Sequence, residues 1–203
     1  MKTATSHDSI ENLLPYGGEA IYYPNILSQD EASGYFDILL ASIAWRHDET
    51  VLMGKRIVAK REVAWYGDRA FEYAYSGSSK IALPWTPALK VLKQIAEDTA
   101  EARFNSCLLN LYHSGDEGLG WHSDNEDSLV KGATIAAISH GGERRFDLMH
   151  RKTKEKVSIM LGNGSLLAML GATQTHWLHS LPKTAKVTEP RISLTFRLMR
   201  ESG

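Results

Sequence analysis

Two residues that could bind a metal ion lie one residue apart in the stretch Trp121-His122-Ser123-Asp124. On an extended segment such residues point to the same side, so the imidazole of His122 and the carboxylate of Asp124 could bind one ion. A second imidazole would leave about three positions of an octahedral iron open, the arrangement found in non-haem Fe(II) oxygenases. Spacing alone does not identify that imidazole. The candidates are His176, His179, His113, His140 and His150.

Four polar residues share one side of a strand pattern near the end of the chain: Arg191, Ser193, Thr195 and Arg197. If this side is buried, a guanidinium there needs a partner, and its fork fits one carboxylate of a dicarboxylic acid whose other end chelates iron. Asn110 and Tyr112 also share a strand face and could add hydrogen bonds. The alternative is an edge strand whose polar face lies in water.

Two helices are predicted ahead of these segments. Ser28 precedes an acidic first turn and an apolar face over residues 29–44, and Thr86 caps a helix that begins at Pro87 and runs to about residue 102. Short apolar or alternating runs typical of strands follow at 107–112, 134–139, 145–149, 156–161, 165–170 and 191–199. This order predicts an α+β fold that is mainly β: a double-stranded β-helix (jelly roll) with N-terminal helices packed on one sheet and the metal at its open end.

A chain of 203 residues, 43% of them hydrophobic, is expected to form a single domain over residues 1–203, with a loose tail at 1–16. Cys107 is the only cysteine, which excludes a disulfide framework and fits a reducing compartment. Neither a secretion signal nor a membrane-spanning apolar run is visible. We therefore expect no membrane partner and a location in the cytoplasm of a bacterium or the nucleus of a eukaryote. A monomer is the default expectation for the oligomeric state.

Charge is distributed unevenly around a net value of −1. Residues 1–50 hold two basic and eight acidic residues, a net charge of −6, so the remainder carries +5. Basic residues gather at 55–61, 144–156 and 183–186. These clusters could bind nucleic-acid phosphates, although solvated loops are the simpler explanation.

Taken together, the motifs resemble the AlkB family of Fe(II)/2-oxoglutarate-dependent nucleic-acid dioxygenases, and most closely its animal-type DNA repair members. The resemblance covers about residues 22–199, and the combined set of motifs is specific although each piece alone is weak. The matching stretches are Trp65-Tyr66-Gly67-Asp68, Tyr73-Ala74-Tyr75-Ser76-Gly77, Trp85-Thr86-Pro87, Asn110-Leu111-Tyr112, Trp121-His122-Ser123-Asp124 with Glu126, His179-Ser180-Leu181-Pro182 and Pro190-Arg191-Ile192-Ser193-Leu194-Thr195-Phe196-Arg197.

The resemblance implies a catalytic iron held by His122, Asp124 and His179, and not by His176. It also implies that Arg191 pairs with the distal carboxylate of the cosubstrate 2-oxoglutarate, and that O2 binds at the remaining iron position. The cofactor would supply the difficult chemistry, while the side chains mainly position and tune it.

Further residues of the site follow from the same resemblance. Asn110, Tyr112 and Arg197 would complete the 2-oxoglutarate pocket. Ser193 stands where several relatives have asparagine, which is a departure from the family pattern. Glu126 matches an acidic position that contacts the damaged base.

An alkylated base inside a duplex must be flipped out before it can react. The segment around Leu52 and Met53 resembles the base-flipping hairpin of duplex-acting relatives, with Met53 as a wedge. Residues assigned to the substrate are Leu52, Met53, Arg61, Tyr73, Tyr75, Ser76 and Glu126, with Lys55, Arg56 and Arg61 holding phosphates. The simpler reading is core packing for the tyrosines and a packed tip for the hairpin.

The resulting hypothesis is oxidative demethylation of N-alkylated bases in DNA, such as 1-methyladenine and 3-methylcytosine. An alternative is a 2-oxoglutarate oxygenase that acts on methylated RNA, a protein or a small molecule. A non-catalytic reader of alkylated nucleic acid would be favoured if a metal ligand or the cosubstrate arginine were missing, and neither is. A jelly-roll metal protein without 2-oxoglutarate is disfavoured by Arg191, Asn110 and Tyr112.

Overall fold

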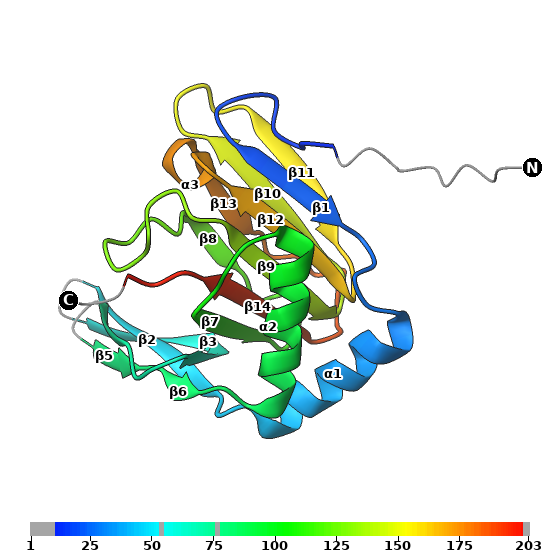
Figure 1. The fold of residues 1–203 in the computed structure, drawn as a ribbon, viewed down its shortest axis with the longest axis vertical. Coiled ribbons are helices and arrows are strands. Elements are labelled where there is room, and N and C mark those ends of the chain that lie inside the picture. The colour runs from blue at the N-terminus through cyan, green and yellow to red at the C-terminus, as the bar shows by residue number, and fades with distance from the viewer. Residues whose placement is uncertain (1–10, 53–54, 76–77, 201–203) are drawn as a thin grey trace, which may run out of the picture.

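Strands dominate the structure, a computed structural model that describes residues 11–52, 55–75 and 78–200. In the larger sheet the order is β1 (Glu19–Tyr23), β12 (Ser165–Leu170), β9 (Ile135–Gly141), β14 (Arg191–Arg197), β7 (Ser106–Tyr112), β3 (Lys55–Gly67) and β2 (Arg46–Leu52), and β6 (Leu83–Pro84) pairs with β3. In the smaller sheet the order is β11 (Lys156–Leu161), β10 (Arg144–His150), β13 (Trp177–Leu181) and β8 (Leu119–His122). A separate hairpin consists of β4 (Glu72–Tyr75) and β5 (Ser78–Ile81), and the short helix α3 (Thr173–His176) leads into β13. The facing sheets confirm the predicted jelly roll (Figure 1).

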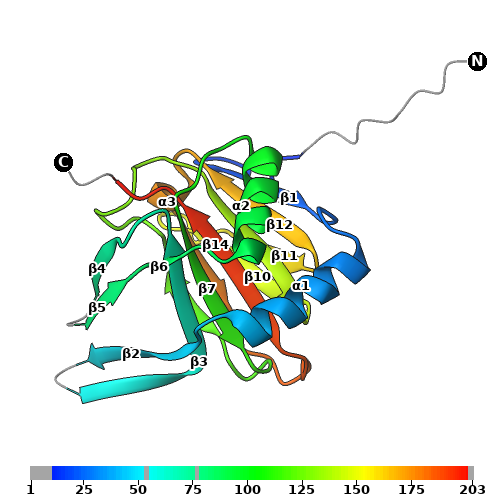
Figure 2. The same cartoon turned by 60° about the horizontal axis from the view of Figure 1, so that its bottom comes forward.

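Both predicted helices are present, and they pack on one face of the larger sheet (Figures 1 and 2). α1 (Gln29–Ser42) begins with a capping box, in which Ser28 and Glu31 satisfy each other's backbone N–H groups. α2 (Pro87–Ala100) begins after Thr86, whose hydroxyl accepts from the backbone N–H of Leu89. Each helix ends two residues before its predicted limit.

Strand β14 lies in the middle of the larger sheet, between β9 and β7, so the alternative of an exposed edge strand is wrong. Its apolar residues Ile192, Leu194 and Phe196 are buried in the core beneath the helices. Because side chains alternate along a strand, the polar set that begins at Arg191 faces the space between the two sheets.

A second apolar core lies between the sheets and joins Leu167 and Met169 of β12 to Leu148 of β10 and Trp177 of β13. This core fills part of the space between the sheets. The space that it leaves is a cavity lined by residues of both sheets.

Strands β2 and β3 form a long hairpin that extends from the body of the protein (Figure 2). Strand β3 pairs with β7 only from Glu62 to Gly67, and its earlier residues pair with β2. The register shifts between His47 and Glu49, where residues 59–61 of β3 stand opposite Asp48 alone. Such an irregularity bends a hairpin and redirects its side chains.

Part of the expected N-terminal tail is packed against the body. Leu14 is buried, Asn12 forms a bridge with Ile21, and the hydroxyl of Tyr16 donates to the carboxylate of Glu155 at 2.7 Å. These residues are therefore packed against the body, while 1–10 lie outside the described part of the chain and the expected tail stays a prediction there. No helix among the described residues is long and apolar enough to cross a membrane.

Candidate metal and cosubstrate site

Three side chains that could bind one metal ion meet between the sheets. One ligand atom from each of His122, Asp124 and His179 lies within 4.8 Å of the others. His122 ends β8 and stands directly opposite His179 on the neighbouring strand β13, so strand pairing brings the two imidazoles together, and their ring centroids are 4.2 Å apart. Asp124 follows two residues after His122.

His176, which spacing alone left open, lies elsewhere. Its ring is 6.3 Å from that of His150, which itself packs against Tyr16 and Trp177. His140 lies under α1, where its Nδ1 hydrogen-bonds with the carbonyl of Ala32.

The surroundings of the two imidazoles prepare them to bind a metal. Nδ1 of His122 is 2.8 Å from the carbonyl oxygen of Gly120, which can only accept, so Nδ1 is the donor there and Nε2 is the nitrogen available to a metal. His179 is buried and stacks on Phe146, with ring centroids 5.4 Å apart. Burial lowers the pKa of His179 to about 3, which keeps its imidazole neutral, the form that binds metals.

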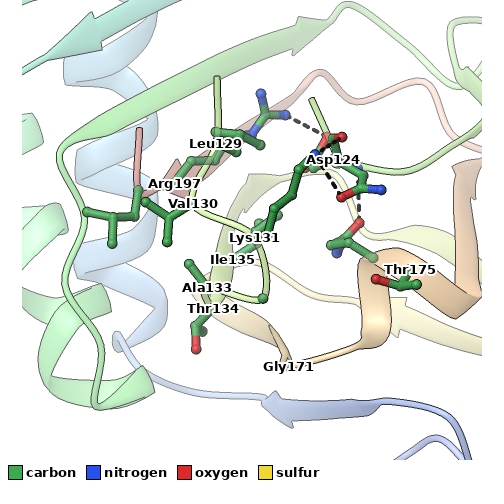
Figure 3. Close-up of a pocket in the computed structure, with 14 residues that line it drawn as sticks. Asp124, Leu129, Val130, Lys131, Ala133, Thr134, Ile135, Gly171, Thr175 and Arg197 are labelled. Atoms are coloured by element: carbon green, nitrogen blue, oxygen red, sulfur yellow. Dashed lines mark hydrogen bonds and ion pairs between the residues drawn. The ribbon is translucent and has the colours of Figure 1, made fainter. Parts of the chain in front are cut away.

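Asp124 is fixed on both its side chain and its backbone. Arg197 donates from Nη2 to the Asp124 carboxylate at 2.8 Å (Figure 3), and Gln174 of α3 accepts from the Asp124 backbone N–H at 2.9 Å. Burial is the largest influence and would by itself raise the pKa of Asp124, but the charge of Arg197, the two nearby imidazoles and the hydrogen bond from Arg197 together outweigh it, and the pKa is lowered. The carboxylate is therefore ionised and held in place, as a metal ligand requires.

Arg191 is a buried cation that lacks a carboxylate partner among the described residues. It is 2% exposed, donates from Nη2 to the hydroxyl of Ser139 at 2.9 Å, and lies 5.8 Å from the ring centroid of Tyr112, while its Nε has no partner there. Burial lowers the pKa of Arg191 to about 10. A guanidinium that remains charged in this setting calls for an anionic ligand.

The metal group and Arg191 open into one cavity of about 720 Å³ between the sheets. Strand pairing explains how its polar residues meet, because Tyr112 stands opposite Arg191 and Asn110 stands opposite Ser193. The residues that the sequence placed around the metal and the cosubstrate all line this cavity: Asn110, Tyr112, His122, Asp124, His179, Arg191, Ser193 and Arg197. Their individual roles stay predictions.

Arg61, which was expected to hold a phosphate, forms two contacts inside the protein. Its Nη2 donates to the carboxylate of Asp48 at 2.5 Å, and its Nε donates to Oδ1 of Asn110 at 3.3 Å. The side chains of Arg61 and Asp48 are only 17% and 12% exposed, and both residues line the cavity. A guanidinium engaged in this way is largely withdrawn from solvent, and its expected contact with a phosphate stays a prediction.

Of the other predicted substrate contacts, the structure places Glu126, which lines the cavity. Met53 and Ser76 lie outside the described residues, as do the side chains of Leu52, Tyr73 and Tyr75, so their roles stay predictions. Sequence analysis assigned no role in the site to several residues that line the cavity or contact its lining, namely Asp48, Trp65, Ser139, Phe146 and Gln174.

Comparison with known proteins identifies the class. Residues 19–197 match the family model described as the 2OG-Fe(II) oxygenase superfamily. The human protein named alpha-ketoglutarate-dependent dioxygenase alkB homolog 3 is 35% identical over 185 residues, which are 86% of this chain and 64% of that protein. The mouse DNA oxidative demethylase ALKBH2 is 39% identical over 155 residues, covering 72% of this chain and 64% of that protein. The protein of the same name from Arabidopsis thaliana is 30% identical over 213 residues, which cover 92% of this chain and 68% of that protein.

Among solved structures, that of OsALKBH1 superposes with a TM-score of 0.63 at 16% identity, covering 91% of this chain and 98% of the other, which supports the fold. The chain belongs to the 2OG-Fe(II) oxygenase superfamily and, within it, to the AlkB family. It spans less than two thirds of the length of the human and mouse relatives.

The residues present fit the metal and the cosubstrate of this superfamily. Two imidazoles and one carboxylate match the ligand set of Fe(II) in oxygenases of this kind. The buried Arg191, with an unpartnered Nε, matches a carboxylate of 2-oxoglutarate.

Proposed function

We propose that this chain is an Fe(II)- and 2-oxoglutarate-dependent demethylase of N-alkylated bases in DNA. The observation that carries the proposal is the single cavity that contains both the His122, Asp124 and His179 group and the buried Arg191. A volume of about 720 Å³ falls in the range of cofactor and ligand sites, large enough for a small dicarboxylate beside a nucleobase. The choice of DNA is supported by relatives named DNA oxidative demethylase.

The side chains of the cavity divide the work of the reaction. His122, Asp124 and His179 would hold the iron by three ligands and leave about three positions for cosubstrate and O2. Arg191 would bind the distal carboxylate of 2-oxoglutarate, and Arg197 holds the Asp124 carboxylate in one orientation. With iron, 2-oxoglutarate and O2 bound, the cofactor chemistry would supply the oxidation of the N-alkyl carbon that releases an aldehyde and the repaired base.

Charge supports a nucleic-acid substrate. The turn between β10 and β11 carries Arg151, Lys152 and Lys154, all exposed. Arg151 donates to the hydroxyl of Ser123 at 2.6 Å, so this basic turn is attached to the segment that holds two metal ligands. Phosphates beside a flipped base would lie near such cations. Within the cavity, the carboxylate of Glu126 suits a base such as 1-methyladenine or 3-methylcytosine, which methylation makes cationic.

Repair of 1-methyladenine oligonucleotides tests the proposal. We expect loss of the methyl mass from DNA when Fe(II), 2-oxoglutarate and O2 are all present, measured by mass spectrometry on matched single-stranded DNA, duplex DNA and RNA. His179→Ala should abolish repair, whereas His176→Ala, which changes the histidine outside the metal group, should retain it. Faster repair of RNA than of either DNA would favour the RNA alternative, and loss of repair in both variants would contradict the assignment of ligands.

A further inference from the structure

The base of the β2–β3 hairpin forms part of the cavity wall. Arg61 lies on β3 next to Glu62, the first residue of that strand to pair with β7, and Asp48 lies on β2 at the register shift. Both side chains turn into the cavity and form an ion pair with little exposure to solvent. By contrast, the neighbouring Lys60 points away and forms an exposed ion pair with Asp116.

Arg61 also reaches the cosubstrate part of the cavity. Its Nε donates to Oδ1 of Asn110 at 3.3 Å, while its Nη2 is held by Asp48. Asn110 stands opposite Ser193, two residues along β7 from Tyr112, which stands opposite Arg191. An anion bound by Arg191 would therefore lie within a few ångströms of the Asn110 amide, because diagonal neighbours on a sheet are about 7–8 Å apart at their backbone.

The side-chain amide of Asn110 has two ends with opposite roles, since Oδ1 accepts and Nδ2 donates. Arginine can only donate, so a guanidinium beside the amide selects the orientation in which Oδ1 faces Arg61. No hydrogen bond joins Nδ2 of Asn110 to a residue that the structure describes, so Nδ2 is available to donate to an oxygen in the cavity. An amide turned the other way would present Oδ1 to the cosubstrate and repel its carboxylate.

We propose that Arg61, held by Asp48, is a positioning residue that fixes the amide of Asn110 so that Nδ2 donates to bound 2-oxoglutarate. The inference rests on the proposed function for the identity of the cosubstrate. It adds that the hairpin base and the cosubstrate pocket share one hydrogen-bonded chain from Asp48 through Arg61 to Asn110. The role of Arg61 is thus internal orientation.

Cosubstrate affinity in the absence of turnover tests this role. Calorimetry without O2, with Mn(II) in place of iron, gives the Kd of 2-oxoglutarate for wild type, Arg61→Lys, Asn110→Ala and the double variant. Arg61→Lys keeps the charge opposite Asp48, but an ammonium lacks the fixed fork that holds two partners at once. We expect its Kd to rise about tenfold, the effect of one hydrogen bond of ordinary strength. Lys60→Gln, on the same strand, should leave the Kd unchanged.

The double variant separates positioning from direct binding. If Arg61 acts through Asn110, adding Arg61→Lys to Asn110→Ala should change the Kd by less than about twofold, since no amide remains to orient. Equal effects of Arg61→Lys in both backgrounds would overturn the proposal, as would an unchanged Kd in Arg61→Lys alone. The Mn(II) affinity should stay constant in every variant, and its loss would indicate general damage and also count against the proposal. Absence of 2-oxoglutarate binding to wild type would instead refute the proposed function.

Discussion

Replacing Arg191 with methionine should stabilise the protein in the absence of ligand. Burial lowers the pKa of Arg191 from 12.5 to about 10, which means that folding destabilises the charged guanidinium relative to its neutral form by about 3 kcal/mol. Both folded and unfolded states are protonated below that pH, so the whole penalty applies at neutral pH. Methionine has a similar length and no charge, and its cost is the hydrogen bond to Ser139, about 1 kcal/mol. The expected net effect of Arg191→Met is a gain of about 2 kcal/mol in the free energy of unfolding, a size seen for other buried charges.

Urea unfolding followed by tryptophan fluorescence measures this effect, with and without Mn(II) and 2-oxoglutarate. A ligand at 100 times its Kd should raise the free energy of unfolding of the wild type by about 2.7 kcal/mol. In Arg191→Met, 2-oxoglutarate should no longer raise the free energy of unfolding. Arg144→Met is the matched control, because Arg144 is equally buried but donates to backbone carbonyls of Ser114, Glu117 and Pro182. That variant should be destabilised by several kcal/mol. Destabilisation of Arg191→Met without ligand, or full stabilisation by 2-oxoglutarate, would refute the reasoning.

Three further predictions concern residues around this site. Burial lowers the pKa of His140 to about 4, so as the pH falls the unfolded chain takes up a proton at His140 before the folded protein does. The free energy of unfolding should therefore drop by up to about 3 kcal/mol between pH 6.5 and 4. The drop should be smaller in His140→Gln, and urea unfolding at a series of pH values measures both. Gln174→Ala removes the acceptor of the Asp124 backbone and should weaken Mn(II) binding about tenfold by calorimetry, whereas the exposed Thr175→Ala should not. Glu126→Gln should raise the KM for 3-methylcytosine DNA about tenfold in steady-state assays and leave the Kd of 2-oxoglutarate unchanged, and a shift in both would contradict a contact with the base.

Local spacing was enough to predict β7 and β14, which carry the residues around the cosubstrate, whereas β8 and β13, which carry the two imidazoles, were not among the predicted strands. The alternation of Arg191, Ser193 and Arg197 with apolar residues in β14, and of Asn110 and Tyr112 in β7, follows from burial of one strand face against the helices and the other against the cavity. The helix caps were likewise visible because capping depends on residues three apart in sequence.

What the sequence could not predict depends on pairing between distant segments. The choice of His179 over His176 is fixed by the register of β13 against β8, and without the family resemblance no local pattern distinguishes them. The β2–β3 hairpin extends beyond the main sheet and carries charged residues such as Asp48 and Arg61. Its sequence therefore does not show the alternation of apolar and polar residues that predicts a strand. Their meeting inside the cavity, at a register shift, is a tertiary feature.

The ratio of succinate formed to methyl groups removed tests the central claim most directly. We expect one succinate for each methyl lost from 1-methyladenine DNA, with both products absent when Fe(II), O2 or 2-oxoglutarate is withheld. Methyl loss that does not require 2-oxoglutarate would contradict the site described for Arg191. Succinate without any methyl loss would contradict the cavity as a site for alkylated bases and indicate an oxygenase of another substrate.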